Sequence, residues 1–314
     1  MNMLVVILTY GLTLSLFLRR GHGRREAVLA SSIICGIIVV ILTEALSALH
    51  QLGLTGLRTG WWISLAVIVA VLYFSGKSQE HKFSPEVIPL TARIFMAGIG
   101  AIFLLSAWMA LSGPPTTWDA MSYHLSRVEH WVQNKTIAYY PTNIPRQDSY
   151  PPGAEWVLLH LRILSAGDYF ARSLQCLAMM ASTIGVSLIA RLLGSGVTGQ
   201  CLAALMSACL PMGILQSTST QNDYVVTMWL VSFVYFILNA IKNPRPLQIL
   251  LAAFSLGLAF LTKGYAYLYA LPFLIYWLLA CRSRAWLYRL GVTFFILGIA
   301  LFLNAGYFYR NWHA

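Results

Sequence analysis

The sequence predicts an all-α fold, a polytopic bundle of about ten transmembrane helices with a platform of interfacial helices outside the cytoplasm. Three observations lead to this prediction. Of the 314 residues, 58% are hydrophobic and only 10% are charged, whereas soluble domains have about 25% charged residues. The apolar residues are gathered in long runs, and crossing a bilayer takes about 20 such residues. One long segment, residues 113–169, is much less apolar than the rest of the chain.

The apolar runs define the individual helices that we expect. They lie at residues 3–18, 27–49, 61–76, 91–112, 170–190, 197–215, 224–241, 247–262, 265–281 and 290–307. The first and third runs are short for a span. A weaker apolar stretch at residues 153–164 is too short to cross a bilayer.

The basic residues predict the orientation of these helices. Four arginines follow the first run within residues 19–25, and this order is wrong for a cleavable signal peptide. We therefore expect the start of the chain outside and residues 19–25 in the cytoplasm. With alternating spans, most Lys and Arg then lie at cytoplasmic ends, while the short outer segments hold only Arg58, Lys263 and Arg310. This distribution follows the positive-inside rule and is typical of a protein of the cytoplasmic (inner) membrane.

The net charge of +11 does not indicate nucleic-acid binding, because the basic residues lie where the topology explains them. The five cysteines are scattered through apolar segments without a CxxC pair, so we interpret them as small apolar residues. The expected partners are membrane lipids, and nucleic acid is excluded.

The long outer segment, residues 113–169, is predicted to be an ordered platform, because it is rich in Trp and Tyr. Its first part, residues 118–133, has apolar residues at helical spacing and is expected to be an amphipathic helix in the interface. The polar face of this helix would carry His124, Arg127 and Glu129. A proline-rich segment follows, and residues 153–164 are expected to form a second surface helix.

Two aspartates on the outer side are candidates for chemistry. Asp119 lies where the chain leaves the membrane and enters the platform, so it is a candidate general base or metal ligand. The alternative is an acid that stabilises the helix dipole. Asp223 lies in a wholly polar stretch, residues 216–224, between two apolar runs, and the alternative role there is helix capping.

Several outer cations are candidates for binding a phosphate group. Lys263 lies between two successive apolar runs, where a lysine is costly unless it reaches water or an anion; the alternative is snorkelling to the interface. Arg127, Arg146 and Arg310 are further candidates, because a guanidinium matches phosphate oxygens. Arg310 is equally explained as a topological end charge.

Two more residues join the candidate binding set. His124 is one helical turn from Asp119, so the two could share a divalent cation, although an ordinary surface histidine is the more usual reading. Glu155 begins the second predicted surface helix, where dipole electrostatics is the default explanation. Glu44, within the second apolar run, has no partner that the sequence identifies.

Four segments resemble motifs of the polytopic GT-C glycosyltransferases, in particular family 39 and its ArnT-like or protein-mannosyltransferase-like branch in bacteria. They are residues 118–124 (WDAMSYH), 150–155 (YPPGAE), 220–224 (TQNDY) and 257–264 (GLAFLTKG). The resemblance runs from about residue 94 to the end. It implies a division into N-terminal membrane helices, residues 1–93, and a GT-C-like core, residues 94–314.

The resemblance implies an inverting sugar transfer from a polyprenyl-phosphate-type carrier to an acceptor on the extracytoplasmic face. It assigns the base or metal ligand to Asp119, a second acid to Asp223 and the carrier-phosphate contact to Lys263. The chain departs from the family in having Ala120 where a second acid often stands, which weakens a two-carboxylate metal site.

Two alternatives to an active enzyme remain. One is a transporter or flippase for lipid-linked or small solutes, but only Glu44 is clearly within a span and no internal repeat is visible. The other is an inactive fragment, because members of the family generally continue with further helices beyond the equivalent of residue 314.

Overall fold

The computed structural model describes residues 2–75, 88–281 and 284–313. Within these ranges every regular element is a helix, which confirms the all-α prediction. Seven helices are long and apolar enough to cross a membrane. They are α1 (Asn2–Arg19), α2 (Arg24–Ala48), α3 (Leu54–Phe74), α4 (Leu90–Leu111), α8 (Ser173–Leu192), α11 (Asp223–Lys242) and α14 (Trp286–Leu303).

The three other predicted runs are also helical but do not form a long straight span. Helices α9 (Val197–Ala208) and α10 (Pro211–Ser217) meet at a bend of 69° and together make an eighth candidate span. Helices α12 (Pro246–Thr262) and α13 (Ala266–Ala280) are apolar but have only 17 and 15 residues, short of the roughly 20 that a full span needs. Each of the ten apolar runs therefore contains helix.

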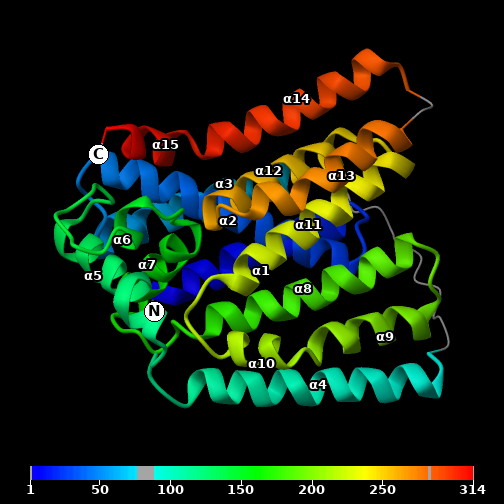
Figure 1. Ribbon diagram of the computed structural model, residues 1–314, viewed down its shortest axis with the longest axis horizontal. Helices are drawn as coiled ribbons and strands as arrows, with labels where there is room; N and C mark the ends of the chain where they lie inside the picture. The colour runs from blue at the N-terminus through cyan, green and yellow to red at the C-terminus, as the bar shows by residue number, and fades with distance from the viewer. Residues whose placement is uncertain (1, 76–87, 282–283, 314) are drawn as a thin grey trace.

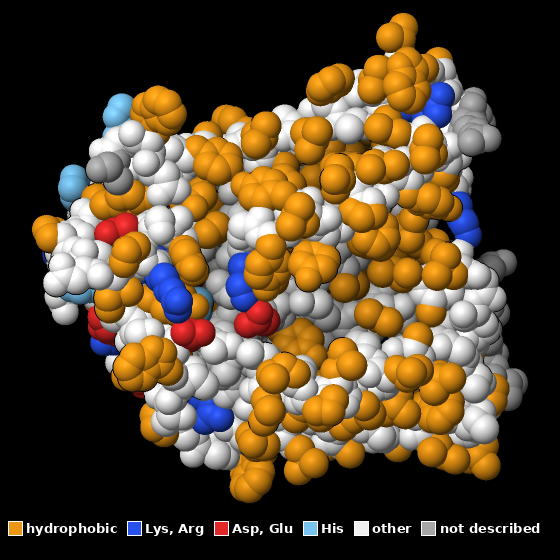
Figure 2. All heavy atoms as spheres, viewed as in Figure 1, with side chains coloured by type: hydrophobic (Ala, Val, Ile, Leu, Met, Phe, Trp, Pro, Cys, Tyr) orange, Lys and Arg blue, Asp and Glu red, His pale blue; other side chains and the backbone are white. Residues whose placement is uncertain are grey.

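The long helices lie side by side, and the platform occupies one end of the bundle (Figure 1). The platform contains α5 (Leu125–Asn134), α6 (Arg146–Ser149) and α7 (Gly153–Ser165). Helix α15 (Ala305–Trp312) and both ends of the chain lie at this same end (Figure 1). Exposed apolar side chains cover much of the bundle, while acidic side chains gather toward the platform (Figure 2), as expected where lipid tails give way to water.

Helices α11 and α12 form the centre of the bundle. Helix α11 packs against α8 and α12, and α12 also packs against α14. Small residues permit the close approach of helices in a membrane. A Cβ at Gly257 would lie 2.6 Å from Leu303 Cδ1 and 3.1 Å from Ala300 Cα, so α12 and α14 meet closely only because residue 257 is glycine.

The N-terminal helices pack directly on the rest of the bundle. Helix α2 contacts α7, α8 and α12. At one joint, Trp61 Nε1 donates a hydrogen bond to His160 Nδ1 (3.1 Å), and His160 Nε2 lies 3.0 Å from Thr43 Oγ1. Because Nδ1 accepts, the proton of the neutral ring is on Nε2, and burial lowers the pKa of His160 to about 3. A division of the chain at residue 93 stays a prediction.

The structure corrects the expected platform helices. The first is a π-helix, η1 (Ala120–His124), followed directly by α5, and π-helical turns often occur at functional sites. His124 and Arg127 were expected on its polar outer face, but both side chains are buried. Helix α7 lies where the second surface helix was predicted, yet it is not a surface helix, because it packs against α1, α2, α3 and α12 and buries Trp156 completely.

Candidate active site

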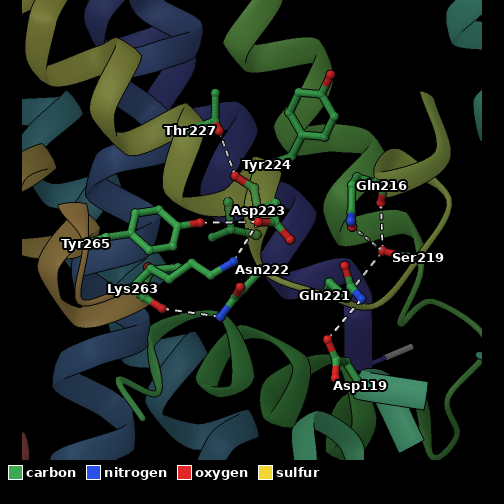
Figure 3. A network of polar contacts seen from close by, with 12 residues as sticks. Asp119, Gln216, Ser219, Gln221, Asn222, Asp223, Tyr224, Thr227, Lys263 and Tyr265 are labelled. Carbon is green, nitrogen blue, oxygen red and sulfur yellow. Dashed lines mark hydrogen bonds and ion pairs between the residues drawn. The ribbon is translucent and has the colours of Figure 1, made fainter. Parts of the chain in front are cut away.

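Asp223 and Lys263 form the centre of the candidate site. Asp223 is the first residue of α11, and Lys263 directly follows α12. Lys263 Nζ donates to Asp223 Oδ1 at 2.6 Å, and the hydroxyl of Tyr265 donates to the same oxygen at 3.3 Å (Figure 3). The two charged side chains are 26% and 36% exposed, so the ion pair can meet a ligand from water.

The start of α11 is capped from another helix. Gln175 Oε1, on α8, accepts the backbone N–H groups of Tyr224 (2.8 Å) and Val225 (3.2 Å). These are amides that the first residues of a helix leave without partners. Asn222, the N-cap residue, makes no side-chain capping hydrogen bond, and the carboxylate of Asp223 accepts hydrogen bonds from Lys263 and Tyr265.

Lys263 is held in its charged form. Burial lowers its pKa, but the hydrogen bonds to Asp223 and Tyr265 raise it by more, so the pKa of Lys263 lies above its ordinary value. Burial also raises the pKa of the Tyr265 phenol, next to the ammonium group. Lys263 therefore stays protonated at neutral pH, with Asp223 as its counter-ion.

Asp119 lies beside this pair, at the start of η1. Its Oδ2 accepts a hydrogen bond from Gln221 Nε2 at 3.4 Å (Figure 3), and its Oδ1 lies 3.7 Å from Arg146 NH1. Both contacts are long, and the carboxylate is 36% exposed. Since Gln221 is two residues before Asp223, one short segment links the two aspartates. The structure therefore links Asp119 and its neighbour Arg146, through Gln221, to the segment that carries Asp223 and its partner Lys263.

All four of the quoted segments meet here, since Gln221 of TQNDY contacts Asp119 of WDAMSYH. Asn222 Nδ2 donates to Thr262 O at 3.3 Å, which joins the TQNDY and GLAFLTKG segments (Figure 3). A Cβ at Gly153 would lie 2.8 Å from Thr262 Oγ1 and 3.0 Å from Leu261 O. The glycine of YPPGAE therefore allows α7 to begin against the end of α12.

Three of the predicted binding residues are buried beneath the site instead of facing it. His124 Nδ1 lies 2.5 Å from Glu155 Oε1, and the side chains are only 2% and 1% exposed. Burial raises the pKa of Glu155, but the charge and hydrogen bond of His124 lower it by more. Arg127 donates to the carbonyls of Asp148 (3.2 Å) and Tyr150 (2.8 Å). None of the three reaches water in this arrangement.

Arg310 is also engaged elsewhere. Its guanidinium donates to both carboxylate oxygens of Glu44 at 2.8 Å and lies over the ring of Trp156, 5.7 Å from its centroid. This ion pair supplies the partner that the sequence did not identify for Glu44. It also means that Arg310 is not available to a phosphate group unless the pair opens.

A divalent cation held by Asp119 and His124 does not fit these residues. His124 is bonded to Glu155 and buried, whereas Asp119 is turned toward Gln221 and Arg146. Across the described part of the chain, no group of three or more His, Cys, Asp or Glu is placed to hold a metal ion.

The platform also contains a cavity of about 350 Å³ between η1, α5 and α7. Its lining includes Met121, Leu125, Leu158 and the Glu129–Arg162 ion pair. None of the four charged residues of the site lines this cavity, so it is separate from the candidate site.

Sequence reasoning missed two residues that contact the acids. Gln221 contacts Asp119, and Tyr265 contacts Asp223. Both could have been found, because Gln221 lies within the TQNDY segment and Tyr265 directly follows the GLAFLTKG segment.

Comparison with curated proteins and with solved structures found no significant match. A family model described as dolichyl-phosphate-mannose-protein mannosyltransferase matches residues 149–307, slightly more than half of the chain. The match contains Asp223 and Lys263 with three of the four quoted segments, and it begins after Asp119. This chain therefore belongs to the dolichyl-phosphate-mannose-protein mannosyltransferase family of GT-C-like membrane glycosyltransferases.

Proposed function

We propose that this protein transfers a sugar from a polyprenyl-phosphate-type carrier to an acceptor at the platform end of the bundle. The observation that carries the proposal is the link from Asp119, through Gln221, to the segment that carries the Asp223–Lys263 ion pair. A carboxylate and a fixed cation, both reached by water, are what a displacement at a sugar phosphate requires. The core of this activity is assigned to residues 94–314.

Asp119 is the proposed general base. Its carboxylate takes the proton of an acceptor hydroxyl, and the freed oxygen forms a bond to the anomeric carbon of the sugar. The bond from that carbon to the carrier phosphate breaks at the same time, and its electron pair leaves with the phosphate. A single displacement of this kind inverts the anomeric centre. The long contacts of Asp119 to Gln221 and Arg146 can be exchanged for an acceptor.

Lys263 is the proposed partner of the leaving phosphate. Charge develops on the phosphate oxygens as the bond breaks, and a cation already in place stabilises that charge. Asp223 orients Lys263 and keeps it protonated. Arg146, which is 53% exposed, is the second cation that can approach the phosphate.

We place this site on the extracytoplasmic face of the cytoplasmic membrane. Two observations support that placement. The basic residues concentrate at the ends of the apolar runs that alternation assigns to the cytoplasm. The chain termini lie at the platform end (Figure 1). If the chain starts outside and crosses the membrane an even number of times, both termini, and the platform with them, are outside.

The transporter alternative gains no support from this structure. Transporters place ionisable residues within their spans, and Glu44 is the only residue that the sequence places clearly in such a position. Here Glu44 is neutralised by Arg310 in a two-bond ion pair. We therefore do not propose transport as a second function.

The proposal is tested with the purified protein in proteoliposomes and a panel of polyprenyl-phosphate sugars, with mass spectrometry of the products. A covalent product whose anomeric configuration is opposite to that of the donor supports the proposal. Movement of an intact donor across the bilayer without any product would contradict it and favour a flippase. Comparing the envelope glycans of cells with and without the gene then identifies the acceptor.

A further inference from the structure

Helix α6 is too short to hold its own position. It has four residues, Arg146–Ser149, and is bounded by Pro145 and by the prolines after Tyr150. Isolated helices of this length are not stable in water, because starting a helix costs more free energy than the hydrogen bonds of a single turn provide. The place of Arg146 beside Asp119 must therefore be fixed by contacts made by the rest of α6 and the residue that follows it.

Gln147 provides the first set of these contacts. Its Nε2 donates to Ser122 O (2.7 Å) and Ser126 Oγ (2.8 Å). Its Oε1 accepts from the hydroxyls of Tyr140 (3.0 Å) and Thr142 (2.9 Å). The side chain is buried, and both donors and both acceptor positions of the amide are used. Gln147 thus ties α6 to η1, the element that directly follows Asp119.

The backbone of residues 148–150, which follows Gln147, is held in a different way. Three successive carbonyls, those of Asp148, Ser149 and Tyr150, each accept a hydrogen bond from a side chain. Arg127, on α5, donates to the first and the third at 3.2 and 2.8 Å. Tyr307, on α15, donates to the second at 2.6 Å. Side chains from two different helices, α5 and α15, therefore hold this segment in place.

The side chains of Arg127 and Tyr307 are both buried, and burying the charged group of Arg127 costs free energy. Arg127 is 1% exposed, and its Nε and NH1 have no hydrogen-bond partner among the described residues. Burial lowers its pKa, which expresses the cost of removing the charge from water. Since Arg127 does not reach the surface, its position is explained by the two carbonyls that it holds.

Helix α15 is held in place by contacts of its own. Arg310 forms the two-bond ion pair with Glu44 of α2. Gly306 lies against the same carboxylate, since a Cβ there would be 2.8 Å from Glu44 Cδ. Tyr139 donates a further hydrogen bond to Asn311. These contacts place the hydroxyl of Tyr307 at a fixed point over α6.

We propose that α15 is a strap that positions Arg146 at the site through the hydrogen bond from Tyr307 to Ser149 O, with Arg127 as the opposing contact. Tyr307 and Arg127 are positioning residues, because neither touches the site itself. This inference rests on the proposed function in one respect: it takes the ligand of Arg146 to be the phosphate of a polyprenyl carrier. It assigns a role to residues that lie outside the acid–cation cluster.

Binding of a long-chain polyprenyl monophosphate in detergent micelles tests this role without requiring sugar transfer. Tyr307→Phe removes one hydroxyl and keeps the ring, so the fold is retained. We expect it to raise the Kd about five-fold, the effect of losing one positioning hydrogen bond. Arg146→Gln should raise the Kd as well, by about ten-fold, because a charge-assisted contact to phosphate is lost.

The decisive measurement is a double-mutant cycle. If Tyr307 acts through Arg146, Tyr307→Phe has no further effect on the Kd once Arg146 is glutamine. The matched control is Tyr309→Phe, which removes an exposed tyrosine hydroxyl from the same helix and should leave the Kd unchanged. An equal effect of Tyr307→Phe in both backgrounds, an unchanged Kd in the single variant, or an absence of wild-type binding would overturn the inference. Binding with the expected coupling but no transfer would overturn only the proposed function.

Discussion

Lys263 Nζ lies 2.6 Å from Asp223 Oδ1, where the end of α12 meets the beginning of α11. The hydroxyl of Tyr265 reaches the same oxygen, and Gln221 extends the network to Asp119 (Figure 3). The relationship joins a cation, its counter-ion and a second carboxylate at the platform end of a membrane bundle.

Replacing Asp223 by asparagine should move the alkaline limb of the pH–rate profile to lower pH. In the native protein the pKa of Lys263 is lowered by burial and raised by more through Asp223 and Tyr265. Asparagine removes the opposite charge, so Lys263 loses its proton at a lower pH. Transfer rates measured from neutral to alkaline pH check this.

Thr227→Val is the matched control for that profile, because Thr227 Oγ1 bonds only the backbone carbonyl of Asp223 and its loss changes no charge. The Asp223–Lys263 ion pair also affects stability. The pair raises the pKa of Lys263 in the folded state, so the stabilisation that it provides is present at neutral pH and is lost as the pH rises through that pKa. An Asp223→Asn profile that coincides with the wild type would contradict the assigned role.

Glu155→Gln should destabilise the fold more than any exposed charge change in the platform. Its partner His124 is equally buried, and removing one member of a buried pair costs about 3–5 kcal/mol. The pKa of Glu155 is lowered in the folded state, so the loss is fully present above the ordinary carboxyl pKa and shrinks as the pH falls through the folded value. Chemical denaturation in detergent at several pH values measures it.

Glu129→Gln is the comparison for that experiment. Glu129 pairs with Arg162 in the same platform, but their side chains are 41% and 31% exposed. Exposed ion pairs contribute about 0–1 kcal/mol. Equal destabilisation by the two substitutions would show that burial of the Glu155 pair is not what matters.

Gly153→Ala should destabilise the junction of α7 with α12. The added methyl group would meet Thr262 Oγ1 at 2.8 Å and Leu261 O at 3.0 Å, and overpacking of this kind costs about 1–3 kcal/mol. Gly167→Ala, in the same outer segment, meets no atom within 4 Å and serves as the control. The free energy of unfolding in detergent distinguishes the two, and an unaffected Gly153→Ala would refute the close approach.

The sequence predicts the bundle well because membrane helices depend on local composition. Each apolar run becomes helical whatever its neighbours are, since only intrahelical hydrogen bonds satisfy the backbone in lipid. Charge bias adds the expected orientation. Asp223 and Lys263 could be identified for a similar reason, because a polar stretch and a lone lysine stand out against apolar surroundings.

The inward-facing platform residues could not be predicted in this way. His124 and Arg127 were assigned to an outer face because they are polar, but both lie on the face of η1 and α5 that is buried, together with Tyr123, Val128 and Trp131. Their partners, Glu155 and the carbonyls of Asp148 and Tyr150, come from later in the chain. The pairing of Glu44 with Arg310 spans 266 positions, and no local pattern encodes it.

The central claim is that Asp119 acts as the base of a sugar transfer, and one comparison tests it most directly. Single-turnover transfer from a polyprenyl-phosphate sugar is measured for the wild type, Asp119→Asn and the control Glu129→Gln, each shown to be folded in the same detergent. We expect Asp119→Asn to slow transfer by about 10²–10⁴-fold, the usual contribution of a general base, and Glu129→Gln to leave it unchanged. Transfer by Asp119→Asn at the wild-type rate would contradict the account.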